Sequence, residues 1–186
     1  MRMPRTLQQG FTLIEILIVV FIIGLMAGMI SLSLGSDKKD NAPYREAQAL
    51  MQAVDFVSEY AALNGEVLAM FISPRESETG GTSWCYRWQR FRDNSWSDLA
   101  DGSLSEHCMP DTVQWELVTE GHLYNYDPDL EIQPPVLVFA PGGDATPVEI
   151  SLFEPSSGSE PQHIEIDMMG ASHWREQDEA KLRDEN

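Results

Sequence analysis

The sequence predicts an α+β protein in which a long N-terminal helix packs on antiparallel β-sheets. Three observations lead to this prediction. Residues 11–34 form an apolar stretch of helical length, residues 43–64 place apolar side chains at helical spacing, and short β-rich segments follow from residue 67 onward. No helical stretch alternates with these segments, which argues against a parallel sheet with crossover helices.

Charge divides the chain of 186 residues in the same way. Its net charge is −18, yet residues 1–10 carry only Arg2 and Arg5, and residues 11–34 carry only Glu15. Residues 35–186 hold 29 of the 30 acids. This acidic balance argues against DNA or RNA binding, which needs a basic face. The chain therefore consists of a basic leader, an apolar rod and an acidic body.

The apolar rod is long enough to cross a membrane. As a helix, its 24 residues span about 36 Å at about 1.5 Å per residue, and a bilayer core is about 30 Å thick. Arg2 and Arg5 favour a cytoplasmic N-terminus, so the body faces outward. A secretory signal is shorter, and a plain signal anchor gives no reason for Glu15, because a carboxylate at membrane depth is costly without a partner.

A cut between Gly10 and Phe11 supplies that partner. The new α-amine is positive and lies one helical turn from Glu15. Pairing with the amine of a neighbouring subunit neutralises both charges and sets a one-turn axial stagger between subunits. Glu15 is therefore predicted to act in assembly.

The run Gly10-Phe11-Thr12-Leu13-Ile14-Glu15, followed by apolar residues, closely resembles the class III signal of type IV pilins and type II secretion pseudopilins. The resemblance implies that a membrane-embedded prepilin peptidase cuts after Gly10 and N-methylates Phe11. It also matches Glu15 to the glutamate of this family that serves subunit assembly.

A second helix is expected at the start of the body. Asp40 or Asn41 can cap it, Pro43 is tolerated in its first turn, and Asn64-Gly65 is a good C-terminal stop. Its apolar stripe, more often core than a partner groove, comprises Ala47, Leu50, Met51, Val54, Val57 and Ala61. In pilin-like proteins this helix continues the membrane helix.

Strands are predicted after Gly65, separated by Pro, Gly, Asp and Ser. They are Val67–Ile72, Trp84–Phe91, Val113–Thr119, Val136–Phe139, Val148–Phe153 and His163–Met168. Residues 172–186 are expected to form a polar tail with little to bury. The predicted organisation is therefore a leader at 1–10, a transmembrane and assembly helix at 11–34, an α+β domain at 35–171 and a tail at 172–186.

The C-terminal half refines the resemblance. Phe139, Pro141 and Gly143 form an F-x-P-x-G element, and a strand, a loop, a strand and Gly170 follow in order. This pattern resembles the H-type minor pseudopilins, whose domain is a helix packed on two antiparallel sheets. The resemblance covers nearly the whole chain, but residues 73–132 match it poorly.

Two cysteines are too few for a disulfide scaffold or a four-ligand zinc site. Cys85 and Cys108 are predicted to form a disulfide, because an outward-facing bacterial domain meets an oxidising compartment. The alternative is a reactive thiol beside His107, which lacks any catalytic signature.

No constellation of catalytic or metal-ligating residues stands out. Asp127-x-Asp129-x-Glu131 begins like a calcium loop, but Ile132 occupies the position that requires glycine. We therefore expect no enzyme activity, no metal and no cofactor. The region of Trp84, Trp88 and Trp96 with Arg87, Arg90 and Arg92 is the most basic part of the acidic body. We expect it to be a contact surface with another subunit, although a strand with alternating neighbours gives the same pattern.

The resemblance implies a structural subunit that is anchored once in the inner membrane, with its domain in the periplasm. Expected partners are other pseudopilins, the prepilin peptidase and the inner-membrane assembly platform. Such minor subunits lie near the tip of a pseudopilus that moves folded exoproteins through an outer-membrane secretin. The alternative is a minor type IV pilin of the FimT type, serving pilus assembly, adhesion or DNA uptake. The acidic end of this chain argues against DNA binding.

Overall fold

The computed structural model describes residues 14, 17–20, 41–77, 80–99 and 104–184. The chain divides into two compact units, residues 1–39 and 40–186, and each is described by itself. In the first unit, the described residues are helical. Within the described part of the chain, no helix has the length and apolarity needed to cross a membrane. Most of the predicted membrane segment, residues 11–34, lies outside the described residues.

The second unit opens with helix α2, which spans Ala42–Asn64. Asn41 precedes it in an extended conformation and Pro43 lies in its first turn. Gly65 ends the helix at φ 64°, a left-handed conformation that glycine adopts without steric cost. The Glu66 N–H then donates to the Ala61 carbonyl at 3.1 Å. The position of the start and the glycine stop are confirmed, but the Asn41 side chain makes no capping hydrogen bond. The buried residues of the helix are Pro43, Ala47, Leu50, Val54, Val57 and Ala61.

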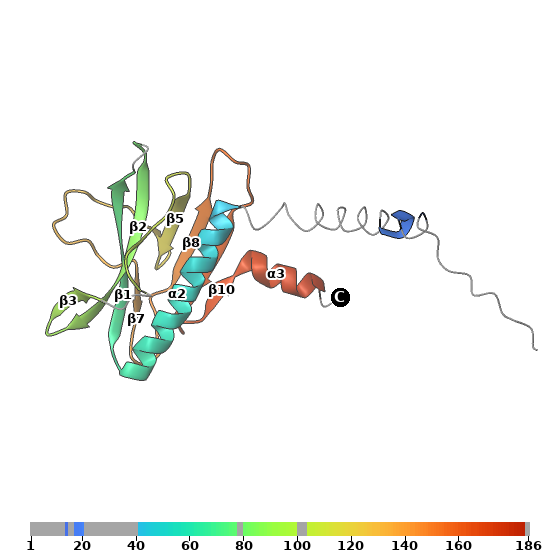
Figure 1. Cartoon of the computed structure of the whole chain (residues 1–186). Helices are drawn as coiled ribbons and strands as arrows, with labels where there is room; N and C mark the ends of the chain where they lie inside the picture. Colours follow the sequence, from blue (N-terminus) through green and yellow to red (C-terminus); the bar gives the residue numbers. More distant parts are fainter. Residues whose placement is uncertain (1–13, 15–16, 21–40, 78–79, 100–103, 185–186) are drawn as a thin grey trace, which may run out of the picture. The chain divides into compact units, whose positions relative to one another are not determined.

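Ten strands in the described residues form two antiparallel sheets (Figure 1). Sheet A has the order β3-β2-β1-β7, with β4 also paired to β2. Sheet B has the order β10-β9-β8-β5-β6. Sheet A contains β1 (Val67–Glu76), β2 (Thr82–Arg92), β3 (Ser95–Asp98), β4 (His107–Cys108) and β7 (Leu137–Phe139). Sheet B contains β5 (Gln114–Thr119), β6 (His122–Leu123), β8 (Val148–Phe153), β9 (Gln162–Ile166) and β10 (Ser172–Trp174).

Helix α2 packs against both sheets. It contacts β8, β9 and β10 of sheet B and β1 and β7 of sheet A, and Figure 1 shows it running alongside the strands. The inward side chains of both sheets meet its apolar stripe and form one core. The largest fully buried side chains include Trp88, Phe139, Leu50, Leu68, Met70 and Ile164. This is the predicted α+β architecture of a helix on antiparallel sheets.

The C-terminal segment differs from its prediction as a polar tail. Strand β10 pairs with β9, which places Trp174 opposite Ile164. Trp174 is only 2 % exposed and packs on Tyr44 at the start of α2. Helix α3, Arg175–Asp184, then follows directly. The sequence prediction was wrong because one buried indole in a three-residue strand gives no periodic signal.

Candidate assembly and contact sites

The predicted cleavage and assembly residues Gly10, Phe11 and Glu15 lie outside the described residues, so their roles stay predictions. Close to them, Ile14 and residues 17–20 are helical. Their apolar side chains are 48–68 % exposed. Exposed apolar side chains on a helix need lipid or other apolar helices to cover them.

The glycines of the H-type pattern meet in space. Gly143 has a φ of 92° in the turn after β7, and Gly170 has a φ of 74° in the turn after β9. A Cβ atom added to Gly170 would lie 2.5 Å from the carbonyl oxygen of Gly143. The Ala145 N–H donates to the Met168 carbonyl at 3.1 Å and joins the same two turns. The pattern therefore encodes a close backbone contact that only glycine permits.

Cys85 and Cys108 form a disulfide, as predicted. The two residues lie directly opposite each other on β2 and β4, with Cα atoms 3.9 Å apart. The Met109 N–H also donates to the Trp84 carbonyl at 2.9 Å. Because β4 has only two residues, the disulfide adds a covalent link to the few backbone contacts that hold it on sheet A.

The same short strand meets helix α2. His107 Nε2 lies 2.6 Å from Glu46 Oε2, and the His107 ring lies tilted against Tyr86 with 5.2 Å between centroids. The hydrogen bond to Glu46 raises the pKa of His107 above its ordinary value of 6.5. Burial, together with the Glu46 charge, raises the pKa of Tyr86, so its phenol stays neutral. His107 and Tyr86 also line a groove of about 410 Å³ between α2 and β2.

The tryptophans that the sequence grouped as one contact surface do not lie together on one face, and the subunit contact itself stays a prediction. Trp88 faces the core, is 1 % exposed and lies against Phe139. Trp96 packs between Phe71 and Phe91. The strand alternation of β2 and the separate strand β3 thus disperse the three indoles.

The arginines of this region are also occupied. Arg90 and Arg92 both bind Glu66, at 3.2 and 2.7 Å, and Arg87 lies 4.0 Å from Asp98. Glu66 and Asp98 therefore offset two of the three positive charges within the domain, which weakens the basic face that the sequence suggested.

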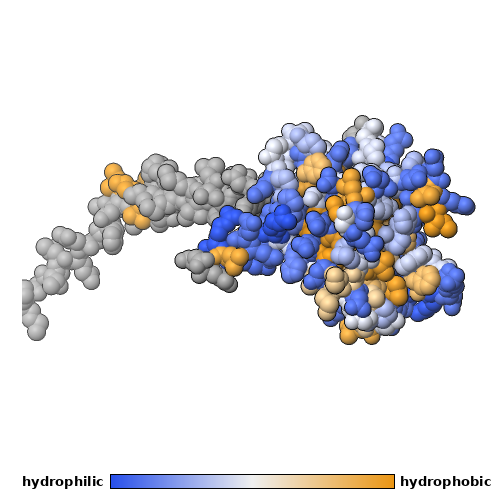
Figure 2. Space-filling model, turned by 180° about the vertical axis from the view of Figure 1, so that it is seen from behind, coloured by the Kyte–Doolittle hydropathy of each residue, from blue (hydrophilic) through white to orange (hydrophobic). Residues whose placement is uncertain are grey.

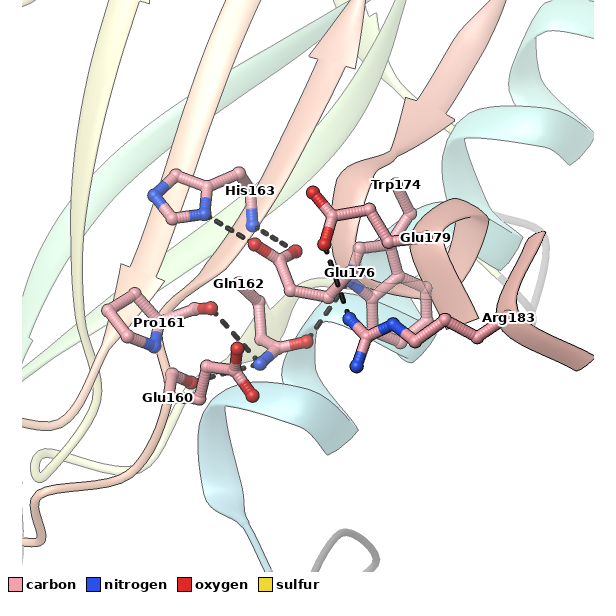
Figure 3. A network of polar contacts seen from close by, with 8 residues as sticks. All are labelled: Glu160, Pro161, Gln162, His163, Trp174, Glu176, Glu179 and Arg183. Atoms are coloured by element: carbon pink, nitrogen blue, oxygen red, sulfur yellow. Dashed lines mark hydrogen bonds and ion pairs between the residues drawn. The ribbon is translucent and has the colours of Figure 1, made fainter. Parts of the chain in front are cut away.

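A polar network fastens the C-terminal segment to sheet B (Figure 3). The Trp174 indole N–H donates to Gln162 Oε1 at 3.1 Å, and the Gln162 amide donates to the Glu160 carbonyl at 2.9 Å. One residue further along β9, the His163 N–H donates to Glu176 Oε2 at 2.8 Å. The other carboxylate oxygen lies 2.6 Å from His163 Nδ1. Strand β10 pairs with β9 only from Ile164 to Ile166, so the N–H of His163 lies just beyond its reach. Glu176 accepts the hydrogen bond from that N–H instead.

No group of three or more His, Cys, Asp or Glu residues in the described part of the chain is arranged to hold a metal ion. In the acidic run, the Asp129 N–H donates to Asp127 Oδ1 at 3.0 Å. The amide of Gln133 donates to the Asp127 carbonyl. These carboxylates and amides therefore shape a surface loop.

Apolar side chains also reach the surface of the domain. Figure 2 shows apolar patches between hydrophilic residues on the face behind that of Figure 1. The most exposed large apolar residues of the second unit are Leu63, Ile132, Met168, Met169 and Leu182, each more than 60 % exposed. These residues are scattered over α2, loops and α3, so they do not define one site by themselves.

Comparison with known proteins adds to these observations. Residues 5–31 match the family model of the prokaryotic N-terminal methylation motif. The chain is 28 % identical over 162 residues to the type II secretion system protein H of Aeromonas hydrophila, which covers 82 % of this chain and 84 % of that protein. It is 25 % identical over 195 residues to the protein H of Dickeya chrysanthemi, with 94 % and 98 % covered.

Solved structures agree at the level of the fold. The minor pseudopilin EpsH from the type 2 secretion system of Vibrio cholerae superposes with a TM-score of 0.56 at 17 % identity. The match covers 72 % of this chain and 95 % of EpsH. A second structure of EpsH gives a TM-score of 0.55.

The methylation motif and the fold of one helix on two antiparallel sheets are similar to those of pilin-like subunits. Within that class, the similarity along most of the chain is to the H-type minor pseudopilins of type II secretion systems, and it supports a minor pseudopilin role.

Proposed function

We propose that this protein is a structural minor subunit of a type II secretion pseudopilus and not an enzyme. It is anchored in the inner membrane by residues 11–34, with its domain in the periplasm, and it lies near the tip of the fibre. There it helps to move folded exoproteins through the outer-membrane secretin. The observation that carries the proposal is the methylation motif joined, in one chain, to a domain similar to the protein H of such systems.

The proposed assembly step rests on paired charges at membrane depth. After cleavage, the Phe11 amine and the Glu15 carboxylate are both costly in lipid unless they are paired. A subunit that offers its amine to the carboxylate of a subunit already in the fibre removes that cost. The driving force is then present only in the correct axial register. Glu15 should therefore govern assembly and leave the folding of the domain unaffected.

Glu15→Leu tests this step when it replaces the wild-type chain in the cell. We expect normal membrane insertion and an intact domain, but less exoprotein secretion and less crosslinking to the other pseudopilins. Ile14→Leu is the matched control, because it alters the neighbouring position without changing charge. Normal secretion and crosslinking in Glu15→Leu would refute charge pairing while leaving the class of protein untouched.

Maturation tests the leader directly. We propose that the prepilin peptidase cuts between Gly10 and Phe11 and that Phe11 is then N-methylated. Mass spectrometry of the purified chain should therefore show an N-terminus that begins at methylated Phe11. Gly10→Val should block this cut, because the peptidase of this family cuts after glycine. A fully matured Gly10→Val chain would refute the assignment of the cleavage site.

A pilus role with DNA uptake has less support. The C-terminal segment carries the bases Arg175, Lys181 and Arg183 among a larger number of acids. Lys181 and Arg183 pair with Asp178 and Glu179 on the same helix, at 3.4 and 3.3 Å. Bases matched in this way on an acidic helix do not attract phosphate.

A further inference from the structure

A cleft of about 380 Å³ lies between sheets A and B, and none of the sites described above uses it. Its lining is largely aromatic. The ring centroids of Trp84 and Trp115 are 6.2 Å apart, and Tyr126 lies 5.8 Å from Trp84. Leu123 lines the cleft as well and is 54 % exposed. The cleft therefore offers aromatic and apolar contacts to a molecule at the surface.

An unpaired strand edge borders this cleft. Strand β5 pairs with β8 along all six of its residues, but β6 pairs only with Val118 and Thr119. The last bond on the β6 side is donated by the Tyr124 N–H to the Leu117 carbonyl at 2.8 Å. Because alternate residues of a strand bond to the same neighbour, the backbone of Trp115 points to this side too. In the described part of the chain, no strand pairs with Trp115 there.

The facing edge of β1 does not offer the same opportunity. Strand β7 pairs with Leu68, Ala69 and Met70, and Ile72 beyond them lines the cleft. Pro74 follows on the same edge and has no N–H to donate, so a ladder of hydrogen bonds cannot be extended there. Strand β5 is therefore the edge on which another strand can be added.

A polar group in the wall of the cleft also lacks a partner. The hydroxyl of Tyr124 is buried, and it has no hydrogen-bond partner within the described residues. Burial raises the pKa of Tyr124, so the hydroxyl keeps its proton.

Charge limits the kind of peptide that fits. Glu116 is the one charged residue in the lining, and its side chain is exposed on the face of β5 opposite to Trp115 and Leu117. The loop that follows Tyr126 carries the exposed acids Asp127, Asp129 and Glu131. On an added strand, side chains level with Trp115 and Leu117 point into the cleft, and those between them lie beside Glu116.

We propose that β5 and this cleft bind an extended segment of another protein by strand addition. The segment has apolar side chains at alternate positions, which enter the cleft, and Lys or Arg between them, which meet Glu116. Backbone hydrogen bonds to Trp115 supply affinity and the cleft supplies selectivity, as in other β-augmentation sites. This interaction surface goes beyond the proposed secretion role and is tested without it.

The test uses the full chain in detergent micelles and a synthetic six-residue peptide of alternating Lys and Val. We expect saturable binding by calorimetry and slower hydrogen exchange at the Trp115 and Leu117 amides. A peptide of the same composition with its three Lys before its three Val should bind at least tenfold more weakly. N-methylation of alternate peptide nitrogens, in the register that removes the donors facing β5, should weaken binding by a similar factor. Equal binding of all peptides, or no binding at millimolar concentration, would overturn the proposal.

Two variants locate the site. Glu116→Lys should weaken binding of the Lys–Val peptide roughly fivefold and favour a Glu–Val peptide instead. Glu165→Lys is the matched control, because Glu165 is exposed on the same sheet but lies on β9. Circular dichroism should show both variants folded. If the two variants change binding equally, the peptide binds by net charge alone and the assignment to β5 is refuted.

Discussion

The carboxylate of Glu176 binds both the backbone N–H and the ring of His163, at 2.8 and 2.6 Å. The Glu176 side chain therefore accepts the backbone hydrogen bond that a further residue of β10 would otherwise accept. This contact holds the start of α3 against β9. The contact joins strand β9 to the segment after residue 171, which was predicted to be a polar tail. It is also a place where stability can be measured against a neighbouring control.

Glu176→Ala should lower the free energy of unfolding by about 2 kcal/mol, because it leaves the His163 N–H without a partner and removes a charge-assisted bond. Urea denaturation of the purified chain measures this loss. Glu179→Ala is the control, because that carboxylate is exposed and pairs with Arg183 on its own helix. The control should cost about 0.5 kcal/mol or less. Equal effects of the two variants would mean that Glu176 has no special anchoring role.

The contact between the two glycine turns predicts a sharp difference between two substitutions. Both Gly158 and Gly170 have positive φ, at 65° and 74°, but a Cβ at Gly158 meets nothing within 4 Å. Gly158→Ala should therefore cost about 1 kcal/mol, from backbone strain alone. Gly170→Ala should cost about 1–3 kcal/mol more, because its methyl group collides with the Gly143 backbone. Thermal or urea unfolding of both variants checks this, and similar stabilities would contradict the contact.

Removing the disulfide should destabilise the domain. Cys85 and Cys108 enclose a loop with a sequence separation of 23 residues. In the chain-entropy model its closure contributes roughly 3–4 kcal/mol. The double variant Cys85→Ser with Cys108→Ser should lose stability of this order and become insensitive to reductant. Peptide maps with and without reduction should differ by one linked peptide in the wild type. Free thiols in protein isolated from the periplasm would refute the pairing.

The pair of Glu46 and His107 predicts a pH dependence. The pKa of His107 is raised in the folded state, chiefly by its hydrogen bond to Glu46. Its contribution to stability is therefore fully present below the unfolded value of 6.5 and is lost as the pH rises through the folded value. His107→Phe keeps a ring beside Tyr86 but cannot titrate. The stability difference between wild type and His107→Phe should be larger at pH 6 than at pH 9. A difference that does not change with pH, or one that grows at high pH, would contradict this prediction.

Long periodic segments were predictable from the sequence, and short ones were not. Helix α2 has a complete apolar stripe, a proline in its first turn and a glycine stop, so its limits followed from local chemistry. Six predicted segments correspond to β1, β2, β5, β7, β8 and β9, because each carries several β-branched or aromatic residues. Strands β4, β6 and β10 have only two or three residues. They form because neighbouring strands hydrogen-bond to them, and local sequence patterns do not reveal such pairing.

Contacts between residues far apart in the sequence were likewise not predictable from local patterns. The disulfide was predictable from the compartment, but its neighbours Glu46 and His107 are 61 residues apart in sequence. One feature of the sequence, the Asp93-Asn94 pair, could have indicated strand β3, which was not predicted. Asp93 and Asn94 lie between β2 and β3 with φ of 52° and 61°, as expected for a tight hairpin turn. A hairpin turn at these two residues predicts a second strand after residue 94, and this strand contains Trp96.

The order in which strands join the sheets determines how the domain unfolds. The chain builds β1 to β4 in sheet A, moves to β5 and β6 in sheet B, returns to sheet A with β7 and ends in sheet B. Neither sheet is complete until the chain has visited the other, and α2 contacts both. The two sheets therefore cannot serve as separate folding units. Calorimetry of the domain should show a single cooperative transition, in which losing one sheet means losing both.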